Sequence, residues 1–458
     1  MTSPADTPSS GAPPRASSSD GTPPARAGVL ARARVELSVF PRQFWLLAGG
    51  FFVLLVGIDM CFPFETTYMH DRLGFSMTTI GLLLGIPLLA ALPFYILDGA
   101  IADRYGRKPS IVIGICTVAG LYLTLAFAGS LWQIAIAVSI EAAFGWALFL
   151  TGSNAMVADL VPLERRAEAY GITRVTLHIG MVVGPLLAAV ILAVDDDYRW
   201  LFLAGASVCA VYILIVLVFF RETLPREARS GESLPATLRG YATVLRDRRF
   251  LAFCSIALLP LYAFGQIWSI FPVMLRNAHG VSPRDWGLLL AFYALSVAVC
   301  QYPMIRWLRR RDHIKLMAVA SALIGLGLGG AVLVPWGVLT FACVFLLGSG
   351  VLLFIPMSST ISAELAPVAL RGRYMGTWTL VQMAGYALGP TFGGTAVDRL
   401  GESGAALVIV ACGLTGAVLY WGLARRLQAV DAAAGAAEEP VTAELIAGGP
   451  PPSAPPVA

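Results

Sequence analysis

The sequence predicts an all-α membrane protein with twelve transmembrane helices in two six-helix bundles that repeat in parallel. The 458 residues are 57% hydrophobic and only 13% charged, with a mean hydropathy of +0.74. A typical soluble domain carries about 25% charged residues. Twelve apolar runs are long enough to cross a bilayer. Their limits are 43–68, 77–98, 110–129, 131–159, 168–193, 200–220, 250–275, 285–305, 314–334, 338–364, 374–397 and 405–424.

The distribution of positive charge predicts that both termini are cytoplasmic. Loops on the cytoplasmic side of a membrane carry an excess of Lys and Arg. With both termini on that side, most of the 32 Lys and Arg fall there. The loops of the opposite face then hold only Arg72, Arg199, Arg276, Arg284 and Arg399. Termini on one side require an even number of spans, which agrees with twelve.

An internal repeat divides the chain into two halves. Segment 159–171 recurs at 364–376 with matching Leu, Pro, Arg and Gly, and segment 180–185 recurs at 385–390. A parallel repeat of six spans is typical of transporters whose halves are related by an axis along the membrane normal. The predicted domains are a disordered cytoplasmic tail (1–38), a six-helix bundle (39–220), a cytoplasmic linker (221–249), a second six-helix bundle (250–426) and a disordered cytoplasmic tail (427–458).

A charged stretch between the second and third runs is the most specific motif. It has the spacing Gly-x-x-x-Asp-Arg-x-Gly-Arg-Lys, carried by Gly99, Asp103, Arg104, Gly106, Arg107 and Lys108. We expect a tight loop in which Arg107 pairs with Asp103 and Gly106 adopts a positive φ. Asp103 can also dock on the N-terminus of a neighbouring helix, and Asp159 can join the cluster. Gly99 lets another helix approach closely. The alternative is a purely topogenic loop, which needs the cations but neither the Asp nor the glycines.

This spacing resembles the loop signature of the major facilitator superfamily. Segment 180–185, Gly-x-x-x-Gly-Pro, resembles the signature of proton-driven antiporters within it, although Ala188-Ala189 stands where that family has Gly-Gly. The resemblance implies a secondary active transporter of the bacterial drug:proton antiporter branch. It would export small amphipathic compounds against protons by alternating access. We expect a monomer in the bacterial inner membrane, with no cofactor, no metal and no nucleic-acid partner.

Other functions remain open at this point. One alternative is an importer, or a carrier of a metabolite or a lipid-linked substrate. A membrane enzyme or a non-transporting receptor is disfavoured, because no nucleophile–base constellation, metal-ligand cluster or phosphate loop is visible. The seven cysteines are spread one per apolar run and show no metal-ligand or redox spacing.

The two glycine motifs are predicted to pack one half against the other. Glycines four residues apart let helix backbones approach closely. The alternative interpretation is ordinary close packing between helices without a hinge role. The residues concerned are Gly180, Gly184, Pro185, Gly385, Gly389 and Pro390.

Few ionisable residues lie within the runs, and each is a candidate proton or substrate site. Asp59 and Glu65 lie in the first run, and Glu141 lies near the midplane of the fourth. Arg174 and His178 are one turn apart in the fifth run, within reach of Glu141. A Glu141–Arg174 contact would be either a static ion pair or a proton relay. Glu141 stands where the family usually has an Arg. The proton-transfer role of that Arg is therefore not assigned to Glu141. Glu141 is the first candidate for proton coupling and Asp59 the second.

Aromatic and Met side chains that can supply an adaptable cavity wall are Trp146, Trp268, Trp378 and Met383.

Overall fold

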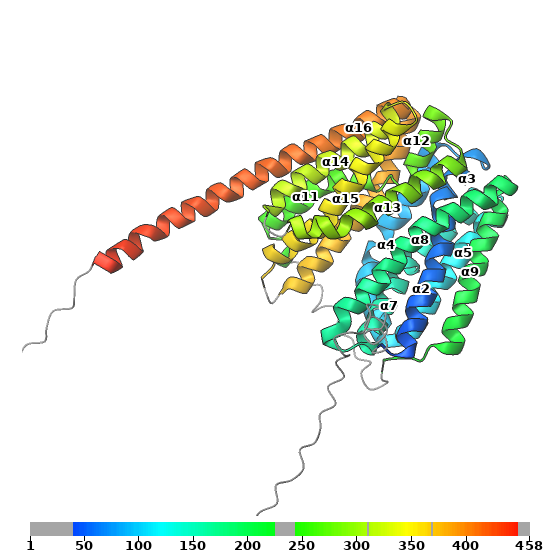
Figure 1. The fold of residues 1–458 in the computed structure, drawn as a ribbon, viewed down its shortest axis with the longest axis horizontal. Coiled ribbons are helices and arrows are strands. Elements are labelled where there is room, and N and C mark those ends of the chain that lie inside the picture. The colour runs from blue at the N-terminus through cyan, green and yellow to red at the C-terminus, as the bar shows by residue number, and fades with distance from the viewer. Residues whose placement is uncertain (1–39, 225–242, 309–310, 368–369, 448–458) are drawn as a thin grey trace, which may run out of the picture. The chain divides into compact units, whose positions relative to one another are not determined.

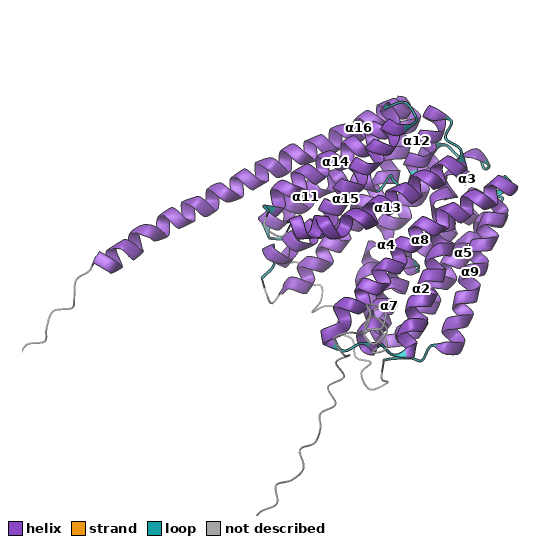
Figure 2. Ribbon diagram, viewed as in Figure 1, coloured by secondary structure: helices purple, strands orange, loops and turns teal. Residues whose placement is uncertain are grey.

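The computed structural model describes residues 40–224, 243–308, 311–367 and 370–447 (Figure 1). The chain divides into a short unit, Met1–Arg42, and a unit from Gln43 to Ala458 that contains the helix packing described below. Helices and loops make up the described part of the chain, without a strand (Figure 2). The predicted tail 1–38, most of the linker and residues 448–458 lie outside the described residues.

Within residues 40–224, the first half forms eight α-helices. Their bounds are α2 Arg42–Cys61, α3 Glu65–Asp71, α4 Met77–Tyr105, α5 Arg107–Phe127, α6 Leu131–Phe144, α7 Trp146–Leu160, α8 Arg166–Val194 and α9 Tyr198–Phe219. The first predicted run holds both α2 and α3, joined by a short 3₁₀ turn. The fourth run is broken at Gly145 into α6 and α7.

The described residues of the second half form six α-helices. Their bounds are α11 Arg248–Phe264, α12 Ile270–His279, α13 Pro283–Leu308, α14 His313–Leu333, α15 Val338–Leu365 and α16 Arg371–Ala447. The last two predicted runs both fall in α16, which has a non-helical residue at Gly401, where φ is 72°. Nine helical segments of the described residues are long and apolar enough to cross a membrane. The number of twelve spans therefore stays a prediction.

Two expectations about local structure were wrong. The stretch 98–108 is not a loop, because α4 continues to Tyr105 and α5 begins at Arg107. Gly106 alone breaks the helix, with φ at 111° as expected. Residues 427–447 of the predicted disordered tail continue α16 as a helix. This segment is rich in Ala and Glu, which have high intrinsic helix propensity.

The two halves meet along two helix pairs, α4 with α16 and α8 with α13. A methyl group added to Gly287 of α13 would lie 2.8 Å from the carbonyl oxygen of Pro185 in α8. Gly81 of α4 lies in the same way against the carbonyl of Pro390 in α16. The repeat relates these two contacts, since Gly81 corresponds to Gly287 and Pro185 to Pro390.

Polar contacts between the halves gather where α4 and α13 begin, an end that we call the predicted outer end. Figure 1 shows α3 and α12 beside each other there, in agreement with the contacts between these helices. The Asp398 carboxylate accepts hydrogen bonds from the backbone N–H groups of Met77 (3.2 Å) and Thr78 (2.7 Å). Arg276 forms an ion pair with Asp71 (3.0 Å). The Trp286 indole N–H donates a hydrogen bond to the Pro63 carbonyl oxygen (3.3 Å).

The glycines of the repeated motif do not form the contact between halves that we expected. Gly184 packs against the backbone of Asp59 and Met60 in α2, within its own half. Gly389 packs in the same way against Gly265, the residue directly after α11, in the second half. These glycines instead allow close packing between neighbouring helices of one half, which was the alternative interpretation. Only the prolines of the motif reach the other half.

Candidate functional site

A charged cluster surrounds the junction between α4 and α5. The Arg107 guanidinium is largely buried and contacts two carboxylates, Asp103 at 2.5 Å and Asp159 at 3.3 Å. Asp103 and Arg107 are four residues apart on either side of Gly106, whose positive φ sets the angle between the helices. Asp159 comes from the end of α7. The cluster therefore joins three helices of the first half, and the pairing expected from the sequence is present.

Glu222 is a member of this cluster that the sequence analysis missed. Its carboxylate accepts hydrogen bonds from the backbone N–H groups of Arg107 (3.0 Å) and Lys108 (3.1 Å). An anion at this position stabilises the positive end of the α5 dipole. We expected Asp103 to dock on a neighbouring helix N-terminus, but here Glu222 is the anion at such an end. In the sequence Glu222 is one acid in a polar segment, and only folding brings it to Gly106.

Further contacts fasten the segment after α9 to the same cluster. The Thr223 hydroxyl donates to Asp159 (2.8 Å). The Lys108 ammonium donates to the carbonyl oxygens of Leu217 (2.8 Å) and Phe220 (2.9 Å). Gly99 was expected to admit a neighbouring helix, yet a methyl group added there would meet nothing within 4 Å. Gly99 lies on the same face of α4 as Gly81, because each residue of a helix turns by 100° and the two are a whole number of turns apart. It lies at the opposite end of the helix.

Asp59 lies buried where α2 crosses α8. One of its carboxylate oxygens has no hydrogen-bond partner. A methyl group on Gly180 would lie 3.3 Å from that oxygen. Burying an unpaired carboxylate is costly unless it is protonated or finds a partner in another state. The motif glycines thus form one wall around Asp59, a contact that the sequence did not indicate.

Glu141 lies near the end of α6 and turns toward the break at Gly145. A methyl group on Gly145 would fall 2.5 Å from a Glu141 carboxylate oxygen. The expected partners are placed elsewhere, since Arg174 is exposed on α8. His178 faces Gln301 of the other half, and neither ring nitrogen has a hydrogen bond of normal geometry. The predicted Glu141–Arg174 pair is therefore absent from this conformation, in which the Glu141 side chain turns toward Gly145 and Arg174 is exposed on α8.

Asp98 is the second residue that the sequence analysis missed. Its side chain is only 1% exposed, and neither carboxylate oxygen has a partner. Tyr95, one turn earlier in α4, lies close enough to interact electrostatically with both Asp98 and Glu141. Glu141 interacts in turn with the buried Glu65 of α3. Asp98 and Glu65 are buried, and Tyr95 and Glu141 are half-buried; we call these four residues of the first half the acidic chain.

The sequence did contain a sign that Asp98 is a candidate site residue. It opens the charged stretch, but it precedes Asp103 by five residues and so points about 140° away from it around the helix. It therefore faces the interior of its own half and not the junction cluster.

The second half has no comparable residues in the described spans. From residue 248 to residue 426, carboxylates occur at helix ends or beside the Gly401 break, at Asp285, Asp312, Glu364, Asp398 and Glu402. Trp378, expected in a cavity wall, is fully buried against Phe253 and Phe354. It is a packing residue of this half.

Comparison with known proteins agrees with this architecture. The family model described as "Major Facilitator Superfamily" matches residues 47–275 and 261–451. The chain is 30% identical over 393 residues to "Multidrug resistance protein MdtH" of Edwardsiella ictaluri (strain 93-146), covering 83% of this chain and 93% of that protein. It is 26% identical over 373 residues to a "Na(+), Li(+), K(+)/H(+) antiporter" of Planococcus maritimus, covering 75% and 87%.

Solved structures with the same fold have little sequence in common with this chain. A crystal structure of the nucleoside transporter NupG aligns with a TM-score of 0.69 at 16% identity, covering 84% of this chain and 98% of that one. A peptide transporter POT in complex with sulfate gives 0.70 at 14% identity, covering 84% and 95%. At such identity the likeness concerns the fold alone.

The chain belongs to the major facilitator superfamily and is similar to its drug:proton antiporters. It is a multi-pass membrane transporter and not an enzyme.

Proposed function

We propose that this chain exports small amphipathic compounds from the bacterial cytoplasm in exchange for protons, by alternating access. Two relatives support the class of substrate and the coupling, one named for multidrug resistance and one for cation/proton antiport. The proposal places the chain in the inner membrane as a monomer with both termini cytoplasmic. The excess of arginine at the end opposite the predicted outer end supports this orientation.

One observation carries the proposal: buried carboxylates without hydrogen-bond partners lie in the first half. Asp98 and Asp59 both have unpartnered oxygens, and the described spans of the second half have no carboxylate at such depth. An ionised group in such a site is unfavourable, so the group tends to bind a proton or a cation. Ionisable residues kept inside membrane helices commonly mark proton relays or substrate paths.

We assign the proton-carrying step to the acidic chain, with Glu141 at its centre. Tyr95 and Asp98 lie in the part of α4 that leads to the arginine-rich end, while Glu65 lies in α3, toward the predicted outer end. Protons and a cationic substrate would compete for Glu141 as access alternates between the two sides. Asp59, between α2 and α8, is the second candidate.

The junction cluster has a different proposed role, the control of conformation. Its side chains link α4, α5 and α7 with the segment after α9. Closing the arginine-rich end would bring Gly99 and Asp103 toward α16, because they share the face of α4 that already contacts α16 near Gly81. This cluster would then affect turnover and leave substrate binding unchanged.

The test is transport in proteoliposomes of fixed protein orientation, with an imposed pH gradient and a panel of amphipathic compounds. We expect uphill movement of at least one compound out of the cytoplasmic side only when the gradient drives protons inward. Glu141→Gln should abolish uphill transport and keep downhill exchange, because it preserves shape and removes the ionisable group. Accumulation in the direction of proton flow would establish the importer. Wild-type pH dependence in Glu141→Gln would transfer the assignment to Asp59.

A further inference from the structure

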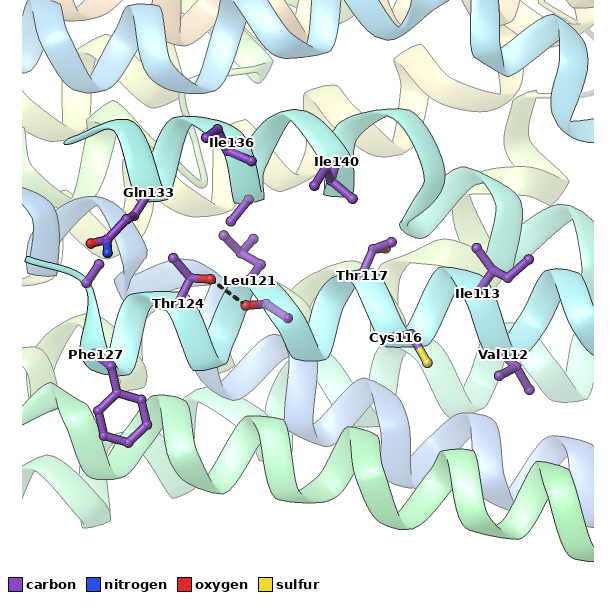
Figure 3. Close-up of a pocket in the computed structure, with 13 residues that line it drawn as sticks. Val112, Ile113, Cys116, Thr117, Leu121, Thr124, Phe127, Gln133, Ile136 and Ile140 are labelled. Carbon is purple, nitrogen blue, oxygen red and sulfur yellow. Dashed lines mark hydrogen bonds between the residues drawn. The ribbon is translucent and has the colours of Figure 1, made fainter. Parts of the chain in front are cut away.

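A long groove between α5 and α6 has no part in the transport mechanism proposed above. It has a volume of about 670 Å³ and is lined by both helices, from Val112 to Ala128 on α5 and the following turn, and from Gln133 to Ile140 on α6. Figure 3 shows the two helices side by side, with Thr117 and Thr124 on one and Ile136 and Ile140 on the other. Gly120 is among the lining residues, and a side chain added there would meet no atom within 4 Å.

The polar side chains in this groove are already hydrogen-bonded within the protein. The Thr117 hydroxyl donates to the Gly114 carbonyl (2.8 Å), and the Thr124 hydroxyl donates to the Gly120 carbonyl (2.8 Å; Figure 3). The Gln133 side-chain oxygen accepts from a backbone N–H (3.0 Å). The surface offered to an occupant is therefore mainly apolar, which suits a hydrocarbon chain better than a polar substrate.

The groove is long enough to cover one leaflet of a bilayer. From Phe127 to Val112 the α5 helix rises about 22 Å at 1.5 Å per residue. One leaflet contributes about 15 Å of hydrocarbon. Trp132 and Trp200 are 75% and 56% exposed at the starts of α6 and α9, near the Phe127 end of the groove. Exposed tryptophans of this kind mark the membrane–water interface.

A second, polar pocket adjoins the groove at that interface. It has a volume of about 620 Å³ and shares Phe127 and Ala128 with the groove. Its lining includes two arginines and three aspartates, namely Arg72, Arg199, Asp195, Asp196 and Asp197. An apolar groove that opens into a charged pocket at head-group depth has the form of a phospholipid site.

The charges of the pocket select among phospholipids. Arg72 is paired with Asp196 (2.5 Å), and Asp197 caps α9 through the Arg199 N–H (2.9 Å). The Arg199 guanidinium lies over the Phe127 ring, 5.9 Å from its centroid, at the junction of groove and pocket. It can contact a phosphate there, while the exposed carboxylate of Asp195 can accept hydrogen bonds from an amine.

We propose that this composite site binds one phospholipid with a primary-amine head group, its acyl chain lying between α5 and α6. Three aspartates against two arginines leave the pocket net negative, which disfavours an anionic head group. A quaternary ammonium carries no N–H to donate to Asp195, so a choline head group binds more weakly. The site is separate from the acidic chain and does not depend on the proposed transport function.

The test is native mass spectrometry of the full chain, titrated separately with phosphatidylethanolamine, phosphatidylcholine and phosphatidylglycerol. We expect one phosphatidylethanolamine to bind at least fivefold more tightly than either other lipid. Gly120→Phe should lower that affinity at least tenfold, because a side chain at Gly120 meets no atom within 4 Å and enters the groove. Gly49→Phe on α2, where space is equally open, is the matched control. Arg199→Gln should weaken the binding of all three lipids, because the phosphate that Arg199 contacts is common to them. Asp195→Ala should remove the preference for phosphatidylethanolamine over phosphatidylcholine, and Arg284→Gln should change neither quantity.

A second measurement uses the unaltered chain. Cys116 is an exposed thiol in the groove. Phosphatidylethanolamine in nanodiscs should slow its alkylation by a lipophilic maleimide at least threefold relative to phosphatidylglycerol, as read for this peptide alone by mass spectrometry. Equal binding of the three lipids, full affinity in Gly120→Phe, or a dimer with Cys116 shielded by the second copy would each overturn the proposal.

Discussion

Gly287 of α13 lies against the backbone carbonyl of Pro185 of α8, with room for no side chain between them. A methyl group on Gly287 would stand 2.8 Å from the carbonyl oxygen and 3.2 Å from the Ala189 side chain. The pseudo-symmetric contact joins Gly81 to Pro390. Both contacts hold the halves together near the predicted outer end, so a change at these glycines acts on the equilibrium between conformations.

Gly287→Val should favour conformations in which the predicted outer end is open. The added side chain meets backbone, which cannot rotate away, and such overpacking costs about 1–3 kcal/mol. That free energy shifts a two-state equilibrium about 5- to 150-fold. Spin-label distances across the predicted outer end should lengthen in the variant. Gly422→Val on α16, where an added side chain meets nothing, should leave them unchanged.

Gly184→Val should destabilise the first half and should not lock the transporter toward one side. An added side chain at Gly184 would meet the Met60 backbone nitrogen at 2.7 Å, within the same half. We expect a loss of stability of about 1–3 kcal/mol, seen as a lower midpoint of thermal unfolding. Gly171→Val in the same helix meets open space and serves as control. A normal unfolding midpoint in Gly184→Val would contradict the packing that we describe.

Asp103→Asn and Glu222→Gln should each abolish most transport while membrane insertion and equilibrium substrate binding stay near normal. The first change weakens the ion pair with Arg107, and the second removes the anion at the N-terminus of α5. Turnover in proteoliposomes and binding in detergent measure the two quantities separately. Glu164→Gln, an exposed carboxylate near the same end, is the control. Wild-type turnover in both variants would mean that the cluster serves topology alone.

Asp98→Asn should reduce transport driven by a pH gradient at least tenfold without lowering protein stability. Asn has the shape of Asp and no charge, so it removes an unpartnered buried carboxylate instead of creating one. Downhill exchange should persist, because the substrate path does not require Asp98. Parallel assays of uphill and downhill transport check this, with Asp285→Asn in the second half as control. A loss of both activities together would assign Asp98 to folding or to substrate binding.

The sequence alone determined the membrane class, the family, the twofold repeat and the pair between Asp103 and Arg107. Each of these depends on composition or on residues close together in the chain. Apolar runs must cover the hydrocarbon of the bilayer, and a residue four positions from another in a tight junction must lie near it. The positive φ of Gly106 belongs to the same group, because a local motif required it.

Only the tertiary structure decided which helices face one another. The motif glycines predicted close contact, but sequence could not say that Gly184 meets Asp59 while Pro185 meets Gly287. Likewise Glu222 reaches Gly106, and Glu141 turns to Gly145 and not to Arg174, through choices made in folding. In lipid, close packing of small residues and satisfaction of polar groups select among helix faces that are all similarly apolar. Hydropathy carries no information on that selection, so the acidic chain and the groove between α5 and α6 emerged only in three dimensions.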